Sequence, residues 1–187
     1  MPAGDEAKAI DLGAHRLDQT QQEYEQRIYG KTASLFAGAA EMGAIIGSTS
    51  EADISALRQY GADVGMAFQI VDDVLDLREG EQQLGKPAGH DLTQGTVTLP
   101  TILYAAGLAS DSAAMTRLRE VVNGDTPAQA EVDRVVQDIR ESGALEAALD
   151  VANAFADKAK FHAAEVTDAE TCEMLAEVAD VIVQRSA

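Results

Sequence analysis

The sequence predicts an all-α protein. Alanine is abundant, aromatic residues make up 4% of the chain and hydrophobic residues 46%; small side chains of this kind favour helices and let them pack closely. Apolar residues recur at the spacing of a helix face, and no segment shows the alternation typical of a strand. The 187 residues suffice for one domain with a core, and no repeat or linker divides them, so we expect a single domain over residues 1–187.

Apolar periodicity and turn residues mark where the helices should lie. The first clear helix has Leu35, Met42 and Ile46 on one face, and Ser50 can cap the helix that follows. The glycine-rich stretch 80–95 is expected to form an irregular loop. The segments expected to be helical are 29–46, 51–77, 100–109, a stretch around 132–139, 145–165 and 169–183.

The strongly acidic composition limits the classes of partner. The formal net charge is −18 and the sequence pI is near 4.3. Nucleic-acid binding needs basic patches that meet phosphates, so we do not expect a nucleic-acid partner. An anionic membrane surface is disfavoured for the same reason. The acidic excess is consistent either with an ordinary solvated surface or with adaptation to high salt, and composition alone leaves both open.

The compartment can be inferred from the cysteine count and the apolar stretches. Cys172 is the single cysteine, so the chain can form neither an intrachain disulfide nor a CxxC metal site. The first residues contain no apolar core of a signal peptide, and charged residues or glycines interrupt every apolar stretch before it could span a membrane. We therefore expect a cytoplasmic protein without an integral membrane segment.

An acidic stripe is the most informative feature of the sequence. On a helix, Asp72, Asp73, Asp76 and Gln69 share an arc of about 100°, while apolar residues cover most of the remaining circumference. Such a helix should be buried, and buried carboxylates are costly unless a cation pairs with them. Hard carboxylate oxygens at this spacing suit Mg²⁺. The alternative is the acidic face of a solvated helix.

Glycines and lysines could complete a site for an anion. Gly65 lies on the same face as the acidic stripe, one turn before Gln69, and we expect it to leave room for a ligand. Lys31 and Thr32 form one candidate pair, and Lys86 lies in a glycine-rich segment whose spacing differs from a nucleoside-triphosphate-binding P-loop. Each lysine could instead be an exposed, solubilising residue.

Four segments taken together resemble the trans-type polyprenyl diphosphate synthases of the polyprenyl synthetase family. Their order and spacing both fit the family, and the similarity is most specific over about residues 20–105. The resemblance implies an isoprenoid-synthase-type helical bundle, of which this chain matches the C-terminal half. The segments are KTASLF (31–36), GMAFQIVDDVLD (65–76), GKPAGHDL (85–92) and GTVTLP (95–100).

The resemblance also implies an activity. Members of the family condense an allylic diphosphate with isopentenyl diphosphate: ionisation yields an allylic cation and pyrophosphate, and the isopentenyl double bond attacks the cation. By this resemblance the second aspartate-rich motif binds Mg²⁺, and the residues around it bind diphosphate and assist the ionisation. The implied metal ligands are Asp72, Asp73 and Asp76, the implied diphosphate-binding residues are Lys31, Gln69 and Lys86, and Thr32 belongs to the same catalytic group.

The chain departs from the family upstream of Lys31. The first aspartate-rich motif of the family and the basic residues that bind isopentenyl diphosphate lie there, but only thirty residues precede Lys31 and they contain no DDxxD. We therefore expect a partial bundle without the N-terminal helices, acting as a homo- or hetero-oligomer. One alternative is a non-catalytic partner subunit that binds Mg²⁺–diphosphate or modulates a full-length synthase. Another is a terpene cyclase-like lyase, against which the KT and GKPxGxD segments argue.

Overall fold

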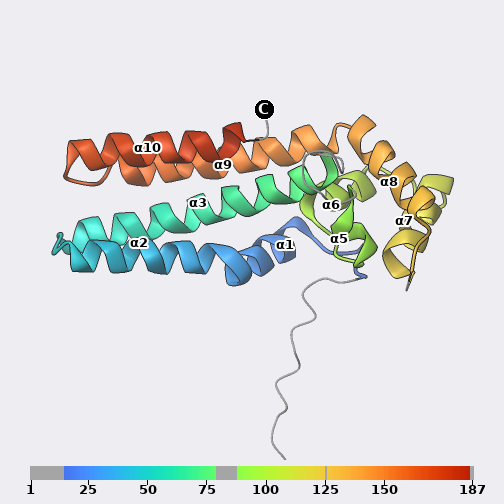
Figure 1. Cartoon of the computed structure of the whole chain (residues 1–187), viewed down its shortest axis with the longest axis horizontal. Helices are drawn as coiled ribbons and strands as arrows, with labels where there is room; N and C mark the ends of the chain where they lie inside the picture. The colour runs from blue at the N-terminus through green and yellow to red at the C-terminus, as the bar shows by residue number, and fades with distance from the viewer. Residues whose placement is uncertain (1–14, 79–87, 125, 186–187) are drawn as a thin grey trace, which may run out of the picture.

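The computed structural model describes residues 15–78, 88–124 and 126–185. Four long helices run side by side and form most of the molecule (Figure 1). Shorter helices gather at one end of this bundle. The long helices are α2 (Ser34–Ile46), α3 (Glu51–Arg78), α9 (Ala144–Ala163) and α10 (Ala169–Gln184). The other elements are α1 (Gln21–Ile28), the π-helix η1 (Tyr29–Ala33), α5 (His90–Thr93), α6 (Leu99–Ala106), α7 (Ala113–Asn123) and α8 (Gln129–Glu141).

Helix α3 is the central element, and both of its ends are held by side chains. At the start, the Ser50 hydroxyl accepts from the Asp53 backbone N–H at 3.1 Å, as the sequence predicted. The buried Asp53 carboxylate also accepts from the backbone N–H and the hydroxyl of Thr167, both at 2.9 Å, which ties the loop before α10 to α3. At the far end, Arg140 of α8 donates to the backbone carbonyls of Leu77 and Arg78.

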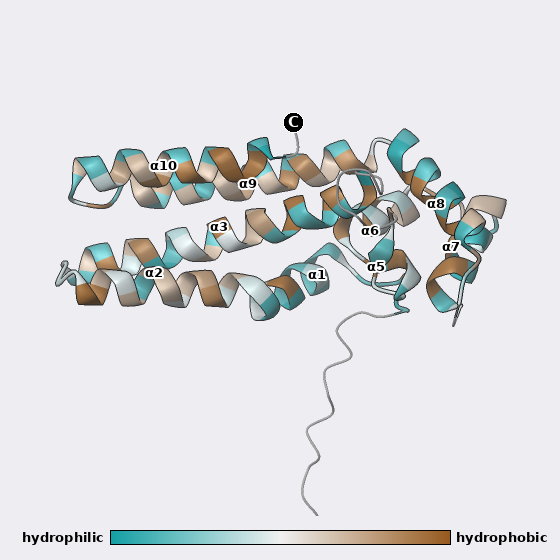
Figure 2. Ribbon diagram, in the orientation of Figure 1, coloured by the Kyte–Doolittle hydropathy of each residue, from teal (hydrophilic) through white to brown (hydrophobic). Residues whose placement is uncertain are grey.

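The core follows the apolar side of α3 in two parts (Figure 2). The larger part joins α3 to the short helices and to the start of α9. The smaller part lies between α3, α9 and α10, where alanines such as Ala156 and Ala159 let the helices approach closely. None of the helices in the described part of the chain combines the length and the apolar character needed to cross a membrane.

The all-α expectation is confirmed, but three helices were not predicted, among them α5, which lies in the stretch 80–95 expected to be an irregular loop. Helix α1 begins at a capping box in which Thr20 and Glu23 bond to each other's backbone N–H, a T-x-x-E signal that the sequence analysis did not use. Helix α7 was missed as well, and the helix expected from residue 29 begins as a π-turn. The apolar face with Leu35 and Met42 is exposed to solvent, at 70% and 60%.

Close helix packing overturns the expectation for Gly65. A β-carbon at this position would lie 2.6 Å from the Ala33 Cα, and one at Gly61 would lie 2.5 Å from the carbonyl oxygen of Phe36. These glycines therefore let α3 approach η1 and α2 backbone to backbone. The prediction that Gly65 leaves room for a ligand is wrong, because Ala33 occupies that space.

We expect Gly65→Ala to lower the free energy of unfolding by about 1–3 kcal/mol, since the added methyl group has to push η1 away from α3. Gly38→Ala on α2 is the matched control. Its β-carbon would meet nothing within 4 Å, and replacing a helical glycine there should stabilise the protein by about 0.5–1 kcal/mol. Urea denaturation of both variants checks this, and equal stabilities would contradict the packing argument.

Candidate functional site

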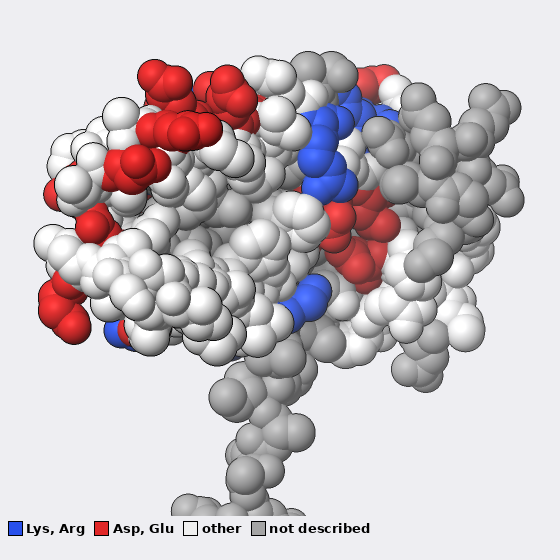
Figure 3. Space-filling view, turned by 60° about the vertical axis from the view of Figure 1, so that its left-hand side comes forward, with Lys and Arg blue, Asp and Glu red and all other residues white. Residues whose placement is uncertain are grey.

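The acidic stripe on α3 faces the segment formed by α1 and η1. Asp73 and Gln69 are buried, Asp76 is half-buried and Asp72 is exposed. On the face shown in Figure 3, acidic side chains gather in a hollow next to lysine or arginine side chains. The expectation that this helix is mostly buried is confirmed. Gln69 and Asp73 of its polar stripe point at a second chain segment, whereas Asp72 lies at the surface.

A continuous hydrogen-bonded relay joins three of the predicted site residues and adds one that was not predicted. Thr32 donates its hydroxyl to Gln69 Oε1 at 2.7 Å, and Gln69 Nε2 donates to Asp73 Oδ1 at 2.8 Å. The phenol of Tyr24 donates to Asp73 Oδ2 at 2.7 Å. Both carboxylate oxygens of Asp73 therefore have a donor from the protein.

The π-turn η1 carries Lys31 and Thr32. A π-turn widens a helix locally and shifts the direction of the side chains on it, and such turns are frequent at functional sites. Here it follows α1 directly, so the phenol of Tyr24 and the hydroxyl of Thr32 reach the same stripe on α3 from one short segment. Lys31 is exposed beside them.

The segment after α3 returns to the acidic stripe. Gly89 has a positive φ of 76°, a conformation that suits glycine, and its N–H donates to the Asp76 backbone carbonyl at 3.0 Å. The backbone N–H of Asp91 donates to Asp76 Oδ2 at 3.2 Å. This brings the carboxylate of Asp91 close to the stripe. Lys86 lies outside the described residues.

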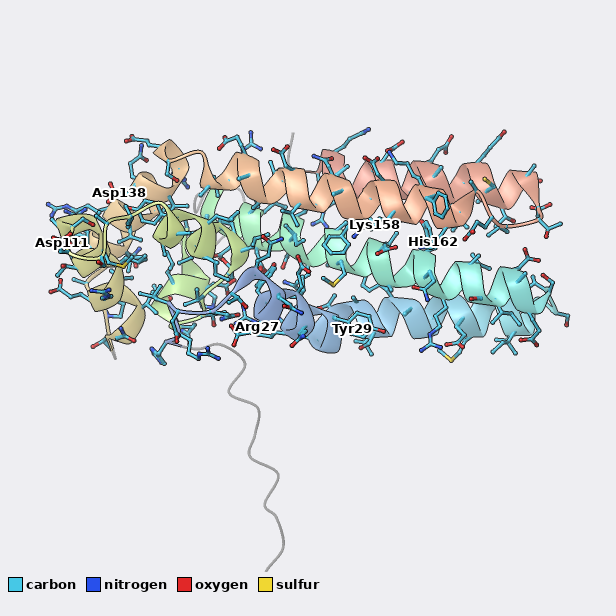
Figure 4. The ribbon with its side chains drawn as sticks, turned by 180° about the vertical axis from the view of Figure 1, so that it is seen from behind. Arg27, Tyr29, Asp111, Asp138, Lys158 and His162 are labelled. Atoms are coloured by element: carbon cyan, nitrogen blue, oxygen red, sulfur yellow. The ribbon has the colours of Figure 1, made fainter. Side chains whose placement is uncertain are left out.

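A cavity of about 240 Å³ opens where these segments meet. It contains two cationic and two anionic side chains. Arg27 donates a hydrogen bond to the Val97 carbonyl. Figure 4 shows Arg27 where α1 meets the shorter helices. His162 lies far along α9 and is not part of the cavity. The lining residues are Arg27, Ile28, Lys31, Gln69, Asp73, Asp91, Thr96 and Thr98.

Sequence reasoning missed three residues of this site. Asp91 lay inside the quoted GKPAGHDL segment, where its position after a glycine-rich turn was the available signal. No sequence pattern marks Tyr24 or Arg27 as a site residue. They reach the site only through the packing of α1 against α3 and the loop before α6.

Burial raises the pKa of each carboxyl group around the cavity whose shift is resolved. Burial raises the pKa of Asp73 to about 7, against the opposing effect of the hydrogen bonds from Tyr24 and Gln69. It raises the pKa of Asp76 to about 6, and the negative charge of Asp91 adds to the shift. The pKa of Asp91 is also raised, mainly by burial, while Lys31 acts in the opposite direction. A cation placed here would favour the ionised forms of all three.

The carboxylates around the cavity suit a metal ion that a bound ligand also coordinates better than one coordinated by protein side chains alone. Within residues 15–78, 88–124 and 126–185, no group of three or more His, Cys, Asp or Glu side chains converges as a metal site. Mg²⁺ is usually held by one or two carboxylates, with phosphate oxygens and water completing its shell. Hard carboxylate oxygens beside two cationic side chains fit that arrangement.

Comparison with known proteins identifies the family. The sequence model of the polyprenyl synthetase family matches residues 5–139. A short chain isoprenyl diphosphate synthase of Methanothermobacter thermautotrophicus is 38% identical over 96% of this chain and 54% of its own length. Heptaprenyl diphosphate synthase component 2 of Bacillus subtilis is 37% identical over 78% of this chain and 40% of its own length.

Solved structures agree with the sequence comparison. A polyprenyl synthase of Caulobacter crescentus, complexed with calcium and isoprenyl diphosphate, has a TM-score of 0.85 and 38% identity over 93% of this chain and 52% of its own. The chain thus spans about half the length of the curated relatives it matches. The resemblance inferred from the four sequence segments is confirmed, as is the isoprenoid-synthase-type helical fold. On this evidence the chain belongs to the polyprenyl synthetase family.

Proposed function

We propose that this chain carries the diphosphate-ionising half of a prenyltransferase that condenses an allylic diphosphate with isopentenyl diphosphate. The observation that carries the proposal is the cavity in which cationic Lys31 and Arg27 lie beside the carboxylates of Asp73 and Asp91. Such a mixture suits a metal–diphosphate group, in which anionic oxygens meet both the metal and the basic side chains. The names of the relatives and the isoprenyl diphosphate in the Caulobacter structure support the same substrate class.

In the proposed reaction the protein stabilises a leaving pyrophosphate. Asp72, Asp73 and Asp76 would hold Mg²⁺, which would supply positive charge that lowers the cost of breaking the allylic C–O bond. Lys31 places a further charge at the cavity, and Thr32 fixes the Gln69 amide. Lys86 stays a predicted diphosphate-binding residue. These site assignments stay predictions of the sequence, as does the cytoplasmic location.

The length of the relatives bears on whether the proposed activity requires a protein partner. The relatives are about twice as long as the part that matches, so the proposed activity needs the remaining elements of their fold. We propose that the chain works within a homo- or hetero-oligomer. The name of the Bacillus subtilis relative, component 2, is consistent with a divided synthase.

A second candidate function is a non-catalytic subunit that binds Mg²⁺–diphosphate or modulates a full-length synthase. The polar cavity favours it, since such a cavity could bind the diphosphate without enclosing the rest of the substrate. Activity measurements separate the two candidates, because only the first predicts product formation.

We expect the double variant Asp72→Ala/Asp76→Ala to lose at least about a hundredfold of its Mg²⁺-dependent pyrophosphate release from farnesyl diphosphate and isopentenyl diphosphate, because groups that stabilise the leaving charge are removed. The matched control is Asp111→Ala/Asp150→Ala, which removes two exposed aspartates elsewhere. An inactive wild type that still binds Mg²⁺ and pyrophosphate in calorimetry would point to a diphosphate site that needs a partner for turnover or to the non-catalytic subunit. An inactive wild type that binds neither would contradict both candidates.

The raised pKa values predict how stability depends on pH in metal-free buffer. The folded pKa of Asp73 is about 7 and that of Asp76 about 6, both above the 3.8 of an ordinary aspartate. The folded state therefore holds protons that the unfolded state releases, so this contribution is present below about pH 4 and is lost as the pH rises through the folded values.

We expect Asp73→Asn to flatten the fall in the free energy of unfolding between pH 4 and pH 8, because the neutral amide does not titrate. Urea denaturation across this range, with chelator present, measures the slope for both proteins. Adding Mg²⁺ and pyrophosphate to the wild type should restore stability at pH 8. Identical slopes in the two proteins would show that Asp73 titrates normally.

A further inference from the structure

Tyr24 is a fully buried residue that the proposed function leaves without a role. Its side chain has 0% of its surface exposed and packs in the larger part of the core. Its hydroxyl group donates a hydrogen bond to Asp73 Oδ2 at 2.7 Å. A buried phenol therefore reaches from α1 to the second aspartate of the acidic stripe.

This hydrogen bond fixes more than one side chain. Asp73 accepts from Tyr24 on one oxygen and from Gln69 Nε2 on the other, at 2.8 Å. Since the carboxylate takes the amide nitrogen, the amide oxygen of Gln69 turns towards the hydroxyl of Thr32. The hydrogen bond from Tyr24 to Asp73 thus helps to set the orientation of the Gln69 amide, with its nitrogen towards Asp73 and its oxygen towards Thr32.

The relay also fastens the backbone that carries Lys31. Tyr24 and Thr32 lie at the two ends of one short segment, and each reaches α3 through the Gln69–Asp73 pair. Lys31 is adjacent to Thr32 and lines the cavity. Its place relative to the acidic stripe therefore depends on both attachments.

We propose that Tyr24 is a positioning residue for the metal–diphosphate site: by holding Asp73 and, through it, Gln69, its hydroxyl sets the geometry in which the site binds Mg²⁺ and a diphosphate. The proposal rests on the proposed function of that site. Groups that hydrogen-bond to the residues of a metal site orient them, and their loss commonly lowers metal affinity or activity by about 10–100-fold.

Tyr60 supplies the matched control. It lies on α3, is 5% exposed, and its hydroxyl donates to the Leu175 carbonyl at 2.8 Å, away from the relay. Tyr24→Phe and Tyr60→Phe each remove one oxygen atom and one buried hydrogen bond while keeping the ring. Both variants therefore lose stability from a missing hydrogen bond, and a difference in binding between them cannot come from that loss.

The test is calorimetric titration with inorganic pyrophosphate in the presence of Mg²⁺, beside urea denaturation of each protein. We expect the two tyrosine variants to lose similar stability, but only Tyr24→Phe to lose about tenfold or more in Mg²⁺-dependent pyrophosphate affinity. Thr32→Val, at the other end of the relay, should weaken the affinity as well. Tyr24 and Thr32 act through the same relay. The binding free energy lost by the double variant Tyr24→Phe/Thr32→Val should therefore be smaller than the sum of the losses of the two single variants.

The outcomes separate this inference from the function on which it rests. Wild-type binding with equal affinities in Tyr24→Phe and Tyr60→Phe would overturn the role of Tyr24 alone and leave a purely structural tyrosine. Fully additive losses would overturn the relay. Wild-type protein that does not bind pyrophosphate with Mg²⁺ would overturn the proposed site, and the role of Tyr24 with it.

Discussion

The carboxylate of Asp73 lies inside the core with 5% of its surface exposed, and the surrounding helices are placed so as to satisfy it. An isolated buried charge would be prohibitively costly, and even a neutral carboxyl group needs partners for its polar atoms. Tyr24 and Gln69 supply them. Helix α1 can therefore meet α3 at only one register, and that register fixes where the cationic residues on α1 and η1 lie.

Glycine makes this register accessible. Because Gly61 and Gly65 have no side chain, η1 and the start of α2 lie directly against α3, closer than a methyl group would permit. That approach lets Thr32, a short residue, reach Gln69 with its hydroxyl. The glycines nearest the acidic stripe thus serve helix contact, and the residues that line the cavity are brought in by that contact.

The predictions that succeeded concern features contained in one segment. The acidic stripe could be found because residues three and four apart on a helix share a face, which is a property of helix geometry alone. Tyr24 could not be found in this way, since its partner Asp73 is distant in sequence and the hydrogen bond depends on how α1 packs. The misreading of Gly65 has the same origin: spacing places it on the face of Asp72, but only packing shows that Ala33 fills the space beside it.

The proposed substrate has two chemically different ends, and the described residues fit one of them. Ile28 is the one apolar residue in the lining of the described cavity, which suits a diphosphate and its metal but offers little wall for a hydrocarbon tail. An allylic cation has to be kept from water, so the tail needs an apolar enclosure. The exposed apolar face of α2 begins at Leu35, one turn beyond Lys31, and continues to Met42 and Ile46. A tail whose diphosphate occupied the cavity could follow this face, and a partner that covered the face would keep the tail from water.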